Sequence, residues 1–337
     1  MVRCALDTSI ERQTIDEIAL PLGVRALEPL VPKTGYRVGF EPADGDDEEG
    51  DVEAWPDRYV YEVVVSATRL QALCRMLFST LPGRVYPILD FLGHDAYREI
   101  DPYIAYEPVG IERFYDGLMR YGPFLYEDGL CGFGVMSEAP FTYIFLDEHK
   151  VLTIRSEADD ESPARIESVL KAFGLSQIEE PAGVDAVLHE HRGVLAAPED
   201  RPELMTQEEI VEALREEWRL TLNVDGQQNL DDEGNELGTT VWRCLTRVGE
   251  DGGKFKYVEV LLVAPNMLRA EELASEATEQ LLKDSGVDPA APTEPPIFEG
   301  VVAADRITPD QLGQLSGVRE SVRSDEEGRI IRRQWVE

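Results

Sequence analysis

The residues whose types and spacing are best suited to chemistry are two histidines separated by one residue, His189 and His191. They fall in a predicted strand, whose period of two aims both imidazoles at one face, as a pair of metal ligands requires. Glu190 points to the opposite face, and Glu179 or Glu180 reaches the pair only if the fold brings them together. We therefore expect a surface or edge-strand pair with no metal site, and folding that neither divalent metals nor chelators alter.

An acidic run at 225–236 places oxygen donors at alternating positions with a Glu at the twelfth, the ligand order of a helix–loop–helix calcium site. Its sixth residue is Leu230, where that site needs a glycine, and the residues that follow are predicted to form a strand. A hairpin loop is therefore the favoured interpretation.

Cys131 is surrounded by glycines, including Gly129, Gly132 and Gly134, which would permit the close approach of a ligand. A nucleophilic thiol needs a base to hold it as a thiolate, and no histidine lies near it in sequence. The glycine spacing also matches no nucleotide-binding fingerprint. We interpret Cys131 as a buried strand residue, and predict no catalytic residue and no cofactor.

The segment 93–110 contains two prolines and no sustained periodicity, which predicts a long loop inside the aromatic-rich stretch 86–145. Tyrosine brings a large contact area at small entropic cost, and arginine offers a fork that holds carboxylates. These properties predict a binding surface made of His94, Tyr97, Arg98, Asp101, Tyr103, Tyr106, Arg113, Arg120, Tyr121 and Tyr126. The competing interpretation packs the same tyrosines into the core and pairs the arginines with nearby carboxylates.

The elements that must position these residues belong to a chain of 337 residues, of which 43% are apolar. This length exceeds what one hydrophobic core usually serves, so two domains are expected. A net charge of -35 repels nucleic acids and anionic membranes, so neither is an expected partner. The four cysteines form no CxxC pair and are expected to be reduced. No apolar run approaches the roughly 18 residues of a membrane helix, and with no signal-like start we expect a cytoplasmic protein.

The pattern of apolar residues predicts an α+β fold with two domains, each a largely antiparallel sheet with packed helices. An N-terminal segment, 1–57, holds a short helix ending near Leu20 and an acidic linker at 41–57. The first domain, 58–197, opens with a βαβ-like unit and continues with a three-strand meander over 131–155, a helix at 162–173 and a strand at 184–191. The second domain, 198–337, opens with a capping box formed by Thr206 and Glu209 and ends in a basic strand, 329–336. Two interpretations of this strand are open, pairing with the protein's own acidic surface or with a partner, and the acidity of the rest of the chain favours the first.

Two domains with many aromatic residues and no catalytic constellation favour a non-catalytic protein-interaction or assembly protein, with a basic protein or a second copy as partner. The alternative function is a hydrolase or transferase acting on small molecules. Its site would lie in the 93–110 loop or at the His189 and His191 pair.

Overall fold

The computed structural model contains two compact units, one formed by Met1–Leu92 with Asp101–Asn223 and one by Gly93–Ile100 with Val224–Glu337. The predicted boundary at 197 therefore differs from the division in the structure, which assigns 198–223 to the first unit and 93–100 to the second. Most of the predicted acidic linker lies outside the described residues, which are 3–43, 55–159, 161–197, 201, 203–250, 254–284, 297–315 and 327–336.

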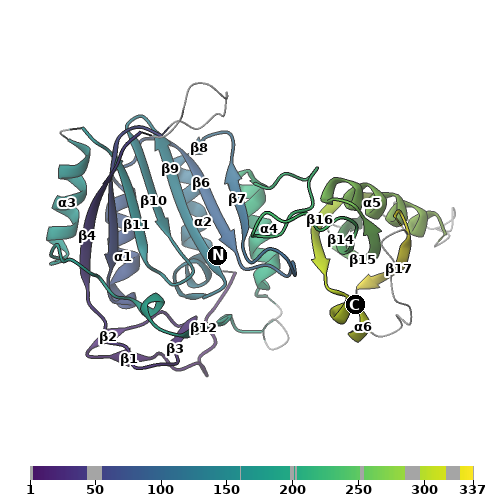
Figure 1. The fold of residues 1–337 in the computed structure, drawn as a ribbon, viewed down its shortest axis with the longest axis horizontal. Helices are drawn as coiled ribbons and strands as arrows, with labels where there is room; N and C mark the ends of the chain where they lie inside the picture. Colours follow the sequence, from purple (N-terminus) through teal and green to yellow (C-terminus); the bar gives the residue numbers. More distant parts are fainter. Residues whose placement is uncertain are drawn as a thin grey trace. The chain divides into compact units, whose positions relative to one another are not determined.

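Unit 1 is built on a nine-stranded antiparallel sheet, with the order β13-β7-β6-β9-β10-β11-β5-β4 and β8 paired to β6 (Figure 1). The predicted meander is confirmed as β9, β10 and β11. Strands β5 and β6 run in the same direction with the meander inserted between them, so the opening unit is βαβ-like, as predicted. The strands are β4 Gly35–Glu41, β5 Arg58–Val64, β6 Arg84–Phe91, β7 Asp101–Ala105, β8 Val109–Gly110, β9 Cys131–Glu138, β10 Phe141–Leu146, β11 Leu152–Glu157 and β13 Leu220–Leu222.

Four helices share one hydrophobic core with this sheet. They are α1 Ala67–Phe78, α2 Ile111–Glu127, α3 Ser162–Ala172 and α4 Gln207–Trp218. In Figure 1, α1 and α2 lie behind the sheet, and α3 and α4 appear at its two sides. The strands alternate accordingly: in β11, Leu152 and Ile154 are buried while Thr153 and Arg155 lie on the other face. Helix α4 begins at the predicted capping box, because the Thr206 hydroxyl accepts a hydrogen bond from the Glu209 backbone N–H.

The predicted N-terminal helix is wrong, since this segment forms short strands, β1 Thr14–Ile15 and β2 Ile18–Ala19. They are joined by a two-residue turn at Asp16 and Glu17, both with positive φ of 48° and 67°, a turn that matches the twist of a hairpin. The predicted strand at 184–191 is also shorter than expected. It consists of a 3-10 turn, η1 Val184–Ala186, and β12 His189–His191, which pairs with β3 Val24–Ala26.

The segment 93–110 is not one long loop. Residues 93–100 belong to unit 2, and β7 and β8 follow. Strand β7 forms because alternate residues, Tyr103 and Ala105, enter the core, and because its two neighbours β6 and β13 satisfy its backbone groups.

Unit 2 is a four-stranded antiparallel sheet with the order β16-β14-β15-β17. One face packs against α5 Met267–Asp284, and the other buries Leu312 of α6 Pro309–Gln314. Its strands are β14 Thr240–Glu250, β15 Lys254–Ala264, β16 Ile297–Ile307 and β17 Ile330–Val336. Both units are therefore α+β, as the sequence predicted.

The acidic run 225–236 and the basic strand 329–336, both in unit 2, form hydrogen bonds or ion pairs within that unit. The Asp231 carboxylate accepts hydrogen bonds from the backbone N–H groups of Glu233 and Asn235, which makes the centre of 225–236 a turn. In β17, Arg332 pairs with Glu259 and Arg333 pairs with Asp284, at 2.6 and 2.8 Å. The basic strand therefore pairs with the protein's own carboxylates, as predicted. Among the described residues, no helix is both long and apolar enough to cross a membrane.

Candidate metal centre

Three of the chain's four histidines come together in unit 1: the predicted pair, His189 and His191, and a third, His149. Their ring centroids are 4.6 Å apart for His149 and His189, 4.8 Å for His149 and His191, and 5.0 Å for His189 and His191. One nitrogen from each ring lies within 4.8 Å of the other two, which makes the cluster a candidate metal centre.

Strand β12 presents the pair as its period of two requires. His189 and His191 are half-buried, while Glu190 between them is exposed and pairs with Arg25 of the neighbouring strand β3. Glu190 therefore lies on the opposite face, as the sequence predicted.

His149 is held by the tight turn between β10 and β11. The Asp147 carboxylate accepts a hydrogen bond from the Val151 backbone N–H at 2.7 Å, and Lys150 has a left-handed φ of 64°. The Lys150 side chain is buried and donates to the backbone carbonyl of Cys131. These contacts fix the backbone on both sides of His149, so its ring needs little reorganisation to bind a ligand.

A close contact between two glycines positions His191. His191 Nδ1 lies 2.8 Å from the carbonyl oxygen of Gly129, and a Cβ on Gly129 would lie only 2.0 Å from the carbonyl oxygen of Gly23. Only glycine permits that approach. Gly129, noted in the sequence as part of the glycine-rich stretch around Cys131, therefore serves the packing that orients His191.

The hydrogen bonds of the cluster fix the tautomers of two rings. A carbonyl oxygen only accepts, so His191 Nδ1 donates to Gly129 and His189 Nδ1, 2.7 Å from the Val187 carbonyl oxygen, donates to Val187. Each ring therefore keeps its lone pair on Nε2. Metal-binding histidines commonly have this arrangement, with the second ring nitrogen donating to a carbonyl or carboxylate.

His149 faces carboxylates on its outer side. Its Nδ1 lies 3.3 Å from Glu148 Oε1 and 3.5 Å from Asp147 Oδ2, while its Nε2 lies 2.9 Å from His189 Nε2. Burial acts to lower the pKa of His149, but the hydrogen bond and charge of Asp147 and the charge of Glu148 outweigh it and raise this pKa. Burial, followed by the charge of His149, lowers the pKa of His191. The neighbouring carboxylates therefore favour a positive charge at His149.

Because His189 Nε2 carries a lone pair, the 2.9 Å separation of the two Nε2 atoms requires either a cation shared between them or a proton on His149 Nε2. With metal–nitrogen bonds of about 2.0–2.1 Å, this separation corresponds to an N–metal–N angle of about 90°, as in an octahedral ion. A tetrahedral ion would need a separation of about 3.3 Å between the two Nε2 atoms, and small rotations of the rings would provide it. The competing account is a proton on His149 Nε2, donated to His189.

Cys131, the other candidate for chemistry, is fully buried, and burial raises the pKa of its thiol to about 12. The thiol is therefore protonated at neutral pH, as expected of a structural strand cysteine.

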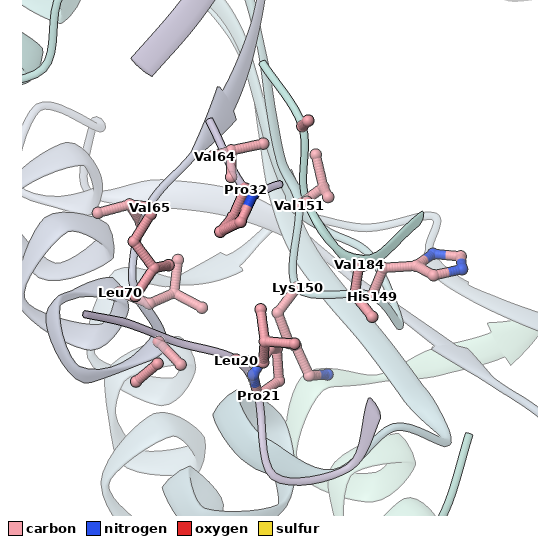
Figure 2. Close-up of a pocket in the computed structure, with 15 residues that line it drawn as sticks. Leu20, Pro21, Pro32, Val64, Val65, Leu70, His149, Lys150, Val151 and Val184 are labelled. Carbon is pink, nitrogen blue, oxygen red and sulfur yellow. The ribbon is translucent and has the colours of Figure 1, made fainter. Parts of the chain in front are cut away.

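A small, mainly apolar pocket adjoins the centre and shares only His149 with it. Its other lining residues include Leu20, Pro32, Val64 and Leu70. Figure 2 shows the His149 ring directed away from the other labelled side chains. The imidazole therefore faces the histidine cluster and not this pocket.

The structure does not bring the predicted binding residues together on one surface of a single unit. His94, Tyr97 and Arg98 belong to unit 2, and the remaining residues belong to unit 1. Four are buried, namely Asp101, Tyr103, Tyr121 and Tyr126, while Tyr106 is 63% exposed. Burial raises the pKa of both Tyr121 and Tyr126. These positions favour the competing interpretation, in which most of the tyrosines belong to the core.

The third ligand escaped sequence analysis because His149 is 40 residues from His189. His149 occurs in the sequence only as part of a turn between two predicted strands. A histidine beside two carboxylates, Asp147 and Glu148, is the one signal that would have suggested a site there.

Comparisons of the chain with protein-family models, with curated proteins and with solved structures found no match.

The carboxyl group of Asp90, which the charge of Glu148 affects, allows a test of how this charge and burial change the pH dependence of stability. It lies on the face of β6 away from the helices, and burial, with the charge of Glu148, raises its pKa to about 6. A carboxyl with a raised pKa binds its proton more tightly in the folded state, so stability is lost as pH rises from about 4 to 6. We expect Asp90→Asn to raise the free energy of unfolding by about 1–3 kcal/mol at pH 7.5 and to change it little at pH 4. Urea unfolding across this pH range measures the difference, and a less stable variant at pH 7.5 would contradict this account.

The core interpretation of the tyrosines has a matched pair of test positions. Tyr103 is 8% exposed, with the Arg215 guanidinium over its ring, whereas Tyr106 is 63% exposed. We expect Tyr103→Ala to lower the free energy of unfolding by about 2–4 kcal/mol and Tyr106→Ala to change it by less than about 1 kcal/mol. Equal effects in urea unfolding would contradict the core interpretation.

Proposed function

We propose that this protein binds one divalent transition-metal ion through His149, His189 and His191. The observation that carries the proposal is the convergence of three imidazoles in which His189 and His191 each donate from Nδ1 to a backbone carbonyl and so present Nε2 as a ligand. Imidazole ligands favour zinc, copper, iron and nickel over calcium and magnesium, which prefer oxygen.

The surrounding carboxylates support this proposal. Asp147 and Glu148 lie beside His149 Nδ1 and offset the charge of a bound cation, and the charge of Asp185 acts on His149 in the same direction. A carboxylate beside the second ring nitrogen of a histidine ligand raises the basicity of that ligand and fixes its orientation.

Three protein ligands leave at least one coordination position for water or another molecule. Structural zinc sites usually fill all four positions with protein ligands, whereas catalytic sites keep one open. The arrangement therefore favours the alternative drawn from the sequence, a hydrolase or transferase at the histidine pair, over a closed structural site. A metal-bound water would supply the nucleophile for such a reaction.

The expectation that no metal is bound depended on the lack of a third ligand, and His149 removes that reason. The interaction or assembly function remains a prediction. Its predicted surface receives little support from the structure, since four of its ten residues are buried.

The direct test is calorimetric titration of the chelator-treated protein with Zn²⁺, Co²⁺ and Ca²⁺. We expect one Zn²⁺ or Co²⁺ per chain with a dissociation constant in the micromolar range or tighter, and much weaker Ca²⁺ binding. Preferred binding of Ca²⁺ would instead assign the cation to the Asp147 and Glu148 carboxylates. The absence of saturable binding would leave a protonated His149 as the account of the cluster.

A further inference from the structure

A second group of charged side chains surrounds a hollow at the start of helix α2 in unit 1. The hollow is lined by Arg84, Arg113 and Arg219 together with Pro108, Val109 and Gly110, and its empty volume, open to solvent, is about 400 Å³. All three charged residues in this lining are arginines, in a chain where acidic residues outnumber Lys and Arg by 67 to 32. The overall composition of the surface therefore does not account for this local excess of positive charge.

The three arginines come from three elements that packing holds together. Arg84 begins β6, Arg113 lies in the first turn of α2, and Arg219 caps the end of α4 with a left-handed φ of 56°. Trp218 Nε1, in the residue before Arg219, donates to the Arg113 carbonyl oxygen at 3.3 Å. This bond joins the end of α4 to the start of α2, so the backbones that carry two of the arginines are fixed relative to each other.

The partners of these guanidinium groups leave donors available. Arg84 uses one Nη2 hydrogen bond to the Pro108 carbonyl oxygen, at 2.8 Å. Arg219 lies 3.5 Å from Glu107 with both side chains largely exposed, and such a pair contributes little. A guanidinium group has five N–H donors, so both groups keep donors for a ligand.

Three like charges around one hollow repel each other, and an anion bound among them would reduce this repulsion. Guanidinium groups match carboxylate and phosphate geometrically, each donating two parallel hydrogen bonds. A carboxylate offers two oxygens, whereas a phosphate monoester offers three terminal oxygens, one for each of three forks from separate elements. Pro108 and Val109 provide apolar surface against which the organic part of such a molecule can pack.

We propose that this hollow binds the phosphate group of a small phosphorylated molecule. The proposal does not rest on metal binding at the histidine cluster, because no residue of that cluster lines the hollow. Arg113 is among the arginines that, from the sequence, could bind an anion. The structure adds Arg84 and Arg219, which the sequence did not identify, to the same hollow.

The test is titration of the chelator-treated protein with inorganic phosphate, followed by phosphorus NMR, in about 0.15 M salt, which screens non-specific attraction. We expect saturable binding that Arg113→Gln weakens by at least about tenfold, since charge-assisted hydrogen bonds are lost. The matched control is Arg120→Gln on the same helix, because Arg120 pairs with Glu217 at 3.3 Å and does not line the hollow. Binding in this control should stay within about twofold of that of the unaltered protein.

Three outcomes would overturn the proposal: no saturable phosphate binding, equal weakening in the two variants, or acetate binding as tightly as phosphate. The His149→Ala variant separates this site from a phosphate held by residual metal. Unchanged phosphate binding in that variant supports the hollow, and lost binding assigns the anion to the histidine cluster.

Discussion

Replacing His149 by Ala is expected to weaken Zn²⁺ binding by at least about 100-fold. Loss of even an outer-shell partner of a metal ligand costs about 10–100-fold in affinity, and here a ligand itself is removed. The remaining pair, His189 and His191, lies on one short strand and offers only two nitrogens. Calorimetric titration of the variant beside the unaltered protein measures the loss.

Stability gives a second readout of the same site. An ion that binds only the folded state, present at about 100 times its dissociation constant, adds about 2.7 kcal/mol to the free energy of unfolding. We expect this gain in the unaltered protein and its absence in His149→Ala. Urea unfolding with and without Zn²⁺ tests it.

Glu190→Ala is the matched control, because Glu190 lies between the two histidines on β12 but is exposed on the opposite face. Its Zn²⁺ affinity should equal that of the unaltered protein. Zn²⁺ binding that survives in His149→Ala, or that is lost equally in Glu190→Ala, would show that surface carboxylates and not the three histidines hold the ion.

Replacing Arg306 by Ala is expected to destabilise unit 2 by about 3–5 kcal/mol, the usual cost of leaving one partner of a buried ion pair uncompensated. Arg306 is 3% exposed, and its Nε lies 3.0 and 2.9 Å from the two carboxylate oxygens of Asp95. Its Nη1 also donates to Asn229 at 3.1 Å, and its guanidinium lies over the rings of Tyr97 and Trp242. Removing Arg306 leaves the buried Asp95 carboxylate without its main counter-charge.

The control for this prediction is Arg269→Ala in helix α5. Arg269 pairs with Glu272 at 2.8 Å, but both side chains are exposed, so the expected change is no more than about 1 kcal/mol. Hydrogen exchange in β14 and β16, measured by mass spectrometry, reports the stability of unit 2 separately from that of unit 1. Equal exchange rates in the two variants would contradict the importance of the buried pair.

The Arg306 pair also explains why residues 93–100 have the sequence pattern of a loop. Asp95 accepts the backbone N–H of Arg306, and the Ala96 N–H donates to the Arg306 carbonyl oxygen, so 93–100 is fixed within unit 2. A segment held by a distant part of the chain has no periodicity of its own, and its sequence therefore resembles that of a free loop.

The sequence was sufficient to predict those elements whose formation depends on residues only a few positions apart. The strands of the meander β9 to β11, the capping box of α4 and the left-handed Gly174 after α3 all follow from residues a few positions apart. The two faces of β12 were also predictable, because a strand alternates its side chains whatever it packs against.

Only the tertiary structure decided what these elements bring together. The sequence determined that His189 and His191 share a face, but the third imidazole, His149, comes from a turn 40 residues away from His189. The orientation of His191 depends on the packing of Gly129 against Gly23. The arginine hollow likewise joins residues from β6, α2 and α4. Both candidate sites are contacts between distant segments, and the free energy that forms them comes from burial of the whole core, which no local pattern encodes.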